Sequence, residues 1–153
     1  MRGVTITDST EDGRFLAFDL IDILRLLEAR IVDSECELSG VECTPFPADS
    51  CPVHTLHNLS DHQARISGKR LLELAANVQQ VFEGEFRAYR NNQLKPWVII
   101  RAVDGAAYDV ESDDRYVLGV MKEHFLDIEE IEIDAYNTSL FPMAKEVGLV
   151  IRL

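Results

Sequence analysis

The sequence has few cysteines, no long hydrophobic run and no secretory signal, and each absence narrows the class of protein. Three cysteines in 153 residues are an odd number, so they cannot all pair within one chain. The longest apolar runs, such as 15–18 and 97–100, are far shorter than the about 20 residues of a membrane-spanning helix. Residues 1–8 lack the apolar stretch of a signal peptide. We therefore expect a cytoplasmic protein with reduced thiols.

Basic residues are also scarce. The 15 Lys and Arg residues are outnumbered by 27 Asp and Glu residues, which gives a formal net charge of −12 at pH 7. Nucleic-acid affinity depends on Lys and Arg that displace counterions from phosphates, and anionic membranes attract the same residues. We therefore expect neither a nucleic-acid partner nor a membrane partner.

The remaining composition is that of an ordinary globular protein, with 46% hydrophobic and 27% charged residues. A length of 153 residues favours one domain with its own core. We predict a single α+β domain over 1–153. Its antiparallel sheet is centred on a three-stranded meander at about 85–111 and packs against two or three amphipathic helices.

The negative charge is concentrated between residues 104 and 134, where eleven acidic residues accompany only two basic ones. One interpretation is a solvated face that keeps the protein soluble, with acids that also start a helix and protect an edge strand. The other is a docking surface for a basic protein partner, since complementary charge selects partners and speeds their encounter. The candidate partner-binding residues are Asp127, Glu129, Glu130, Glu132 and Asp134.

Three segments have the apolar period of helices. The first runs from about 15 to 30, and within it Phe18 and Ile21 fall among polar residues. These two side chains are covered by another segment of the chain or form a self-association patch, which would make the protein a homodimer. The second helix begins at Ser67, a good N-cap, and its apolar stripe continues to residue 82. The third opens at 112–114.

Strand patterns surround these helices. The best are 85–90, 96–103 and 106–111, and Asp104-Gly105 between the last two predicts a two-residue hairpin. That loop length would place Arg101 opposite Tyr108 on one face. Weaker patterns predict strands at 4–7, within 31–43, at 147–153, and at 128–134 as an acidic edge strand. The proline-containing stretch 44–65 predicts a long loop.

All three cysteines and three of the four histidines fall between residues 36 and 62. Thiolate and imidazole are the preferred ligands of zinc, so a zinc site at Cys51, His54 and His57 is one hypothesis. The spacing matches no standard zinc motif, and no pair of cysteines is separated by two residues. The alternative is that no cofactor is bound. Cys36 and Cys43 are then small apolar residues inside strands, and the histidines are polar loop residues.

No nucleophile elbow, phosphate loop, dinucleotide fingerprint or metalloprotease motif occurs. The sequence thus leaves enzymatic activity undecided and favours a non-catalytic protein that binds another macromolecule through its acidic surface. In composition the chain resembles the small acidic α+β proteins that bacteria use as immunity proteins or inhibitors, although the resemblance covers no motif. Besides the zinc hypothesis, a third is a small-molecule-binding protein or enzyme with a pocket between the sheet and the 44–65 loop. Its candidate ligand-binding residues are Arg101 and Tyr108, with Tyr89 as a further candidate.

Overall fold

Seven strands and five helices make up the computed structural model, which describes residues 1–132. The strands are β1 (Arg2–Ile6), β2 (Glu35–Pro45), β3 (Arg65–Ser67), β4 (Val78–Tyr89), β5 (Val98–Val103), β6 (Ala107–Ser112) and β7 (Ile128–Glu132). The helices are α1 (Leu20–Leu26), α2 (Glu28–Ile31), α3 (Cys51–Asp61), α4 (Gly68–Ala76) and α5 (Arg115–His124). No helix in this part of the chain is long and apolar enough to cross a membrane. The predicted strand at 147–153 lies outside the described residues.

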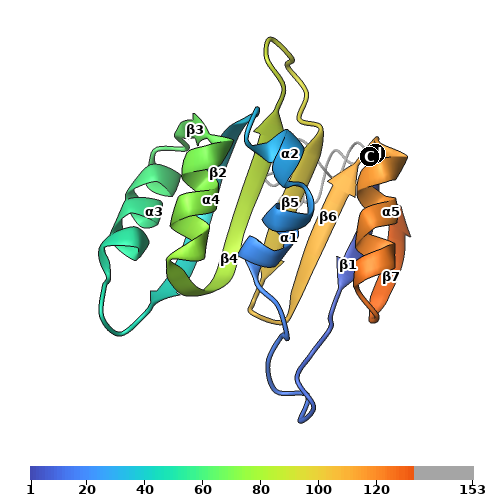
Figure 1. The fold of residues 1–153 in the computed structure, drawn as a ribbon, viewed down its shortest axis with the longest axis horizontal. Coiled ribbons are helices and arrows are strands. Elements are labelled where there is room, and N and C mark those ends of the chain that lie inside the picture. Colours follow the sequence, from blue (N-terminus) through green and yellow to red (C-terminus); the bar gives the residue numbers. More distant parts are fainter. Residues whose placement is uncertain (133–153) are drawn as a thin grey trace, which may run out of the picture.

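The strands form one antiparallel sheet in the order β3-β2-β4-β5-β6-β1-β7. The helices lie side by side on one face of this sheet, in front of the strands in Figure 1. The predicted α+β class and antiparallel sheet are confirmed. Five helices cover the sheet instead of the predicted two or three, and β4 begins at residue 78 rather than 85.

The core lies between the sheet and the helices. A row of buried side chains crosses five adjacent strands in register, and its members are Leu38, Phe86, Ile100, Val110 and Val4. Successive residues of a strand point to opposite faces, so this row fixes which face each neighbour occupies. Apolar residues of α1, α4 and α5 pack against the row and bury it.

The first helix begins later than its apolar period predicts. Residues 15–19 are not helical, and α1 starts at Leu20 after the N-cap position of Asp19. The backbone N–H of Asp19 donates a 2.8 Å hydrogen bond to the carboxylate of Asp22, which fixes the turn. Residues 15–19 therefore run along the surface instead of extending the helix.

The prediction of a long loop over 44–65 was wrong, because this segment contains α3. Pro52 occupies the first turn, where a proline is tolerated because its missing N–H would have no helical partner. Val53 and Leu56 face the sheet, and the Ser60 hydroxyl accepts the backbone N–H of Val41 at 3.2 Å. The prolines of this segment hid the helical spacing of its buried residues.

The second predicted helix has the expected start but an earlier end. The Ser67 hydroxyl accepts the backbone N–H of Arg70 at 3.1 Å, as an N-cap does. The helix stops at Ala76, and the apolar residues Val78 and Val81 belong to β4. The apolar stripe continues past the helix because the strand that follows is also buried.

The hairpin after β5 has the predicted positive φ angles, 52° at Asp104 and 67° at Gly105. Its loop has three residues rather than two, because Val103 pairs with Ala107. A shift of one residue moves every side chain to the other face of the sheet. Arg101 accordingly lies opposite Asp109, and the prediction that it faces Tyr108 was wrong.

Candidate functional site

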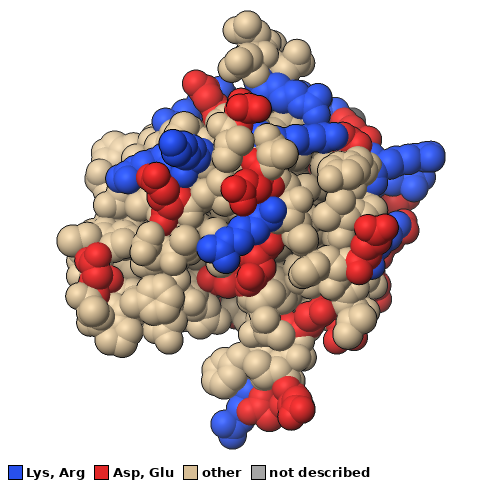
Figure 2. All heavy atoms as spheres, in the orientation of Figure 1, with Lys and Arg blue, Asp and Glu red and all other residues tan. Residues whose placement is uncertain are grey.

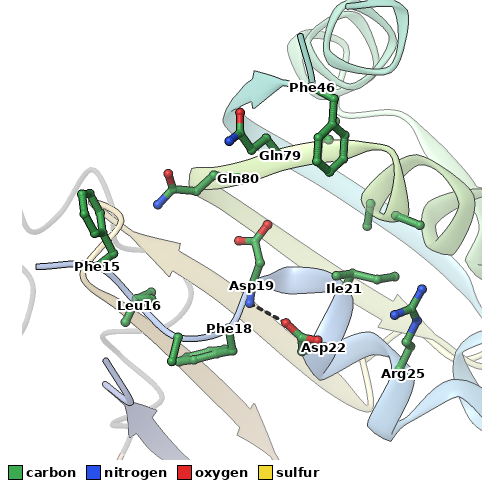
Figure 3. Close-up of a pocket in the computed structure, with 14 residues that line it drawn as sticks. Phe15, Leu16, Phe18, Asp19, Ile21, Asp22, Arg25, Phe46, Gln79 and Gln80 are labelled. Atoms are coloured by element: carbon green, nitrogen blue, oxygen red, sulfur yellow. Dashed lines mark hydrogen bonds between the residues drawn. The ribbon is translucent and has the colours of Figure 1, made fainter. Parts of the chain in front are cut away.

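A groove of about 550 Å³ opens on the helix-bearing side of the molecule (Figure 3). Its walls come from segment 15–19, from α1, from the junction of α4 and β4, and from Phe46, which follows β2. We call it the aromatic groove. It is larger than two other hollows, of about 250 and about 400 Å³.

Three phenyl rings give the groove its apolar character. Phe15 and Phe46 lie on either side of Asp19 in Figure 3, and their exposed fractions are 58% and 45%. Phe18 is half-buried, with its ring centroid 5.4 Å from that of Tyr108 and 4.7 Å from that of Phe125. Phe18 is thus held by the core, whereas the other two rings are open to a ligand.

A carboxylate lies at the floor of the groove. Asp19 Oδ1 accepts the Tyr108 hydroxyl at 2.8 Å, and the Val81 N–H lies 3.2 Å from both carboxylate oxygens. Burial raises the pKa of the Asp19 carboxyl, while the hydrogen bonds from Tyr108 and Val81 act in the opposite direction. The carboxylate is therefore anchored by the sheet, and Figure 3 shows it directed into the groove.

Polar side chains complete the rim. Gln79 and Gln80 lie on the β4 side of Asp19, and the exposed Arg25 lies beyond Ile21 at the end away from Phe15 (Figure 3). The groove therefore offers aromatic faces, amides, a carboxylate and one guanidinium. This set can bind a molecule, and it contains no paired nucleophile and base.

The groove wall is tied to the acidic end of β7. The Asp8 carboxylate accepts the backbone N–H groups of Leu126 and Asp127 at 2.6 to 3.1 Å, and the Asp8 carbonyl accepts the N–H of Ala17 at 2.9 Å. The segment that leads to Phe15 therefore connects the groove with the start of β7.

The predicted partner-binding acids do not form one patch. Glu130 and Glu132 share the helix-bearing side of β7, whereas Glu129 points to the opposite side, and Asp127 precedes the strand. Asp134 lies outside the described residues. Glu130 is paired with Lys122. In Figure 2 the acidic side chains of the helix-bearing face stand in separate groups, most with basic side chains nearby.

The structure separates Arg101 from Tyr108. Arg101 lies on the face of the sheet opposite the helices, where it forms ion pairs with Glu85, at 2.9 Å, and with Glu111. Tyr108 is fully buried on the helix-bearing face beneath the aromatic groove. These two residues cannot line one pocket. Tyr89 lies on the same face as Arg101, and its hydroxyl donates to Glu37 at 3.1 Å.

The zinc candidates lie along one helix. Cys51 and His54 are exposed and His57 is half-buried in α3, three residues apart. Within residues 1–132, no three His, Cys, Asp or Glu side chains gather in a metal-binding arrangement. Cys36 and Cys43 are buried in β2.

Sequence reasoning missed Phe15, Asp19 and Phe46 as members of one site. One signal was present, because Phe18 and Ile21 fell on the polar side of a predicted helix, and both line the groove. Comparison with known proteins identifies no relative: the chain matches no family model, no curated protein and no solved structure.

Proposed function

We propose that this protein is a non-catalytic binding protein, and that a basic partner protein docks one of its segments in the aromatic groove. The observation that carries the proposal is the pair of exposed rings, Phe15 and Phe46, on either side of a groove of about 550 Å³. Aromatic side chains that stand exposed beside a pocket are typical anchors of protein interfaces.

The shape of the groove supports a protein segment as the occupant. Small-molecule sites typically bury about 70–90% of their ligand, whereas this groove is partly open to solvent. Beside it, the surface over α3 carries few charged side chains (Figure 2). A partner could therefore continue its contact beyond the groove.

The charge of the chain supports a basic partner. A net charge of −12 attracts basic proteins over a long range. Asp8 and Asp127 lie where the groove wall meets β7, so negative charge adjoins the proposed docking site. We propose the cytoplasm as the location, on the grounds of the three cysteines.

Photo-crosslinking tests the proposal and captures the partner in the same experiment. A crosslinking phenylalanine analogue is placed at position 15 or 46, and at position 94 as the control, because Leu94 is 97% exposed outside the groove. We expect positions 15 and 46 to crosslink the same protein in the source cells, and position 94 not to. With that protein purified, Phe15→Ser and Phe46→Ser should each weaken binding about tenfold or more, and Leu94→Ser should not.

Three results would contradict the proposal. Equal crosslinking from all three positions would indicate non-specific contact. Crosslinks only to a second copy of this chain would make the groove a homodimer interface, and sedimentation would then show a dimer. Tight binding that survives both serine substitutions would place the docking site elsewhere.

Two other sequence hypotheses stay predictions. Elemental analysis after expression with zinc present tests the site at Cys51, His54 and His57. A groove of about 550 Å³ is also large enough for a small molecule, and native mass spectrometry of protein from the source cells would detect one.

A further inference from the structure

The chemistry of the aromatic groove points to the charge of the group that it accepts. The faces of phenyl rings carry partial negative charge and attract organic cations. Phe15, Phe18 and Phe46 line the groove, together with the carboxylates of Asp19 and Asp22. An aromatic wall next to a carboxylate favours a cation on an apolar stem over a neutral or anionic group.

Asp19 has acceptor capacity to spare. Oδ1 accepts the Tyr108 hydroxyl at 2.8 Å, the Val81 N–H lies 3.2 Å from both oxygens, and the capping box of α1 adds the backbone N–H of Asp22. A carboxylate has about four lone-pair sites, so beside these three donors it can accept one more N–H donor. A cation in the groove would also offset the cost of burying this carboxylate.

The only guanidinium among the groove-lining residues sets the orientation of the occupant. Arg25 lies at the end of the groove away from Phe15 and Phe18 (Figure 3). A bound cation avoids Arg25 by lying near Asp19 and the two phenyl rings. The apolar stem then extends along Ile21 and Phe46.

We infer that the aromatic groove accepts the ammonium or guanidinium end of a lysine or arginine side chain of the partner, with its stem among the phenyl rings and its charge at Asp19. Both side chains combine an apolar stem with a cationic head, which fits this arrangement. The inference rests on the proposed function and names the anchor that the docked segment must carry.

Three probes of equal chain length test the inference on the full chain: n-hexylammonium, n-hexanol and n-hexanoate. Binding is followed by NMR through the backbone N–H of Val81 and the side-chain amide of Gln80. We expect hexylammonium to bind at least about fivefold more tightly than hexanol, and hexanoate to bind most weakly. Asp19→Asn should remove the preference for hexylammonium over hexanol.

Exposed variants keep the test decisive if Asp19→Asn fails to fold. Arg25→Gln removes the opposing charge and should tighten hexylammonium binding about twofold. Arg115→Gln removes an exposed arginine of α5 outside the groove and should change nothing. Equal binding of hexylammonium and hexanol, preferential binding of hexanoate, or no binding of any probe would each overturn the inference.

A peptide-binding experiment identifies the source of the cation. A peptide that covers the crosslinked partner segment is compared with the same peptide in which its lysine or arginine is replaced by norleucine. We expect the norleucine peptide to bind at least about fivefold more weakly than the peptide with lysine or arginine. A crosslinked segment without lysine or arginine, together with tight hexylammonium binding, would assign the site to a free amine instead. Crosslinks at positions 15 and 46 without any hexylammonium binding would overturn the inference and leave the proposed function standing.

Discussion

Replacing Arg101 by methionine tests whether this arginine has a structural role. Its guanidinium pairs with Glu85 at 2.9 Å and with Glu111, whose exposed fraction is 2%. Glu111 Oε1 has no hydrogen-bond partner within residues 1–132, and in that part of the chain Arg101 is the base that pairs with Glu111. Arg101→Met would leave the buried Glu111 carboxylate without a counter-charge among the residues that the structure describes.

Removing one partner of a buried ion pair typically costs about 3–5 kcal/mol. The Arg101 side chain is 24% exposed, and solvent screens part of its interaction, so we expect a loss of about 3 kcal/mol. The double variant Arg101→Met with Glu111→Leu should recover most of this loss, because it removes the unpaired charge and keeps apolar volume.

The loss should also depend on pH. Burial alone would raise the pKa of Glu85, but Arg101 and Arg87 outweigh it and hold that pKa below its usual range. A carboxyl with a lowered folded-state pKa stabilises the fold above its unfolded-state pKa, and this stability disappears as the pH falls through the folded-state value. In Arg101→Met the pKa of Glu85 should rise. Glu85 then protonates at a higher pH than in the wild type, and the difference in unfolding free energy from the wild type should narrow on acidification.

Urea denaturation followed by the fluorescence of Trp97, the only tryptophan and 8% exposed, measures these unfolding free energies. Arg115→Met, at an exposed position of α5, is the matched control and should lie within about 0.5 kcal/mol of the wild type. A loss below about 1 kcal/mol for Arg101→Met, or a double variant no more stable than the single one, would refute the reasoning.

Three further predictions concern other parts of the fold. In the same urea assay, Gly68→Ala should destabilise the protein by at least about 3 kcal/mol, because the added Cβ would overlap the backbone carbonyl of Ile31 in α2. Gly119→Ala should instead stabilise it by about 0.5–1 kcal/mol, because the added Cβ in α5 would meet open space. Ser34→Ala should cost about 1–3 kcal/mol, since the buried Trp97 indole N–H donates to the Ser34 hydroxyl at 2.9 Å. A thiol reagent should modify only Cys51 in the folded protein, because burial raises the pKa of the two β2 thiols to about 12 and about 11. Equal losses for both glycines, an unchanged serine variant, or three reactive thiols would contradict these expectations.

Local chemistry explains which elements were predictable. Ser67 and Asp114 are followed at once by helices, and the hydroxyl and carboxylate accept the N–H groups that an N-cap satisfies. Asp104-Gly105 adopts the positive φ angles expected of these residues. Each of these features depends only on residues that are close together in the sequence, so the sequence alone predicts it.

The errors came from features that local chemistry does not determine. The stripe from Leu71 to Phe82 fits a helix, but the chain changes to a strand at Val78 because both elements bury their apolar residues against one core. One extra residue in the hairpin loop moved Arg101 to the other face. The groove brings together residues from three separate segments, so the sequence could not place Phe15 beside Phe46.

The charge of the folded protein likewise differs from what the acidic segment of the sequence indicates. The segment 104–134 is strongly acidic, yet bases from elsewhere in the chain neutralise several of its acids, and Asp113 pairs with Lys95 at 2.7 Å. Asp127 and Glu129 line a hollow of about 250 Å³ beside the end of β1, and Asp8 joins this region to the groove wall. Long-range attraction depends on where net charge remains.

Charge reversal at Asp127 and Glu129, at the start of β7, should therefore slow association with the crosslinked partner more than reversal at Asp113. Asp113 follows the last residue of β6 and is paired with Lys95. We expect the double variant Asp127→Lys with Glu129→Lys to lower the association rate constant about threefold or more at low salt, with little effect at high salt. Asp113→Lys changes less charge, so the comparison is made per reversed residue by stopped-flow kinetics. Equal slowing per residue would mean that total charge alone steers the partner, and the location of these acids at the start of β7 would then have no part in recognition.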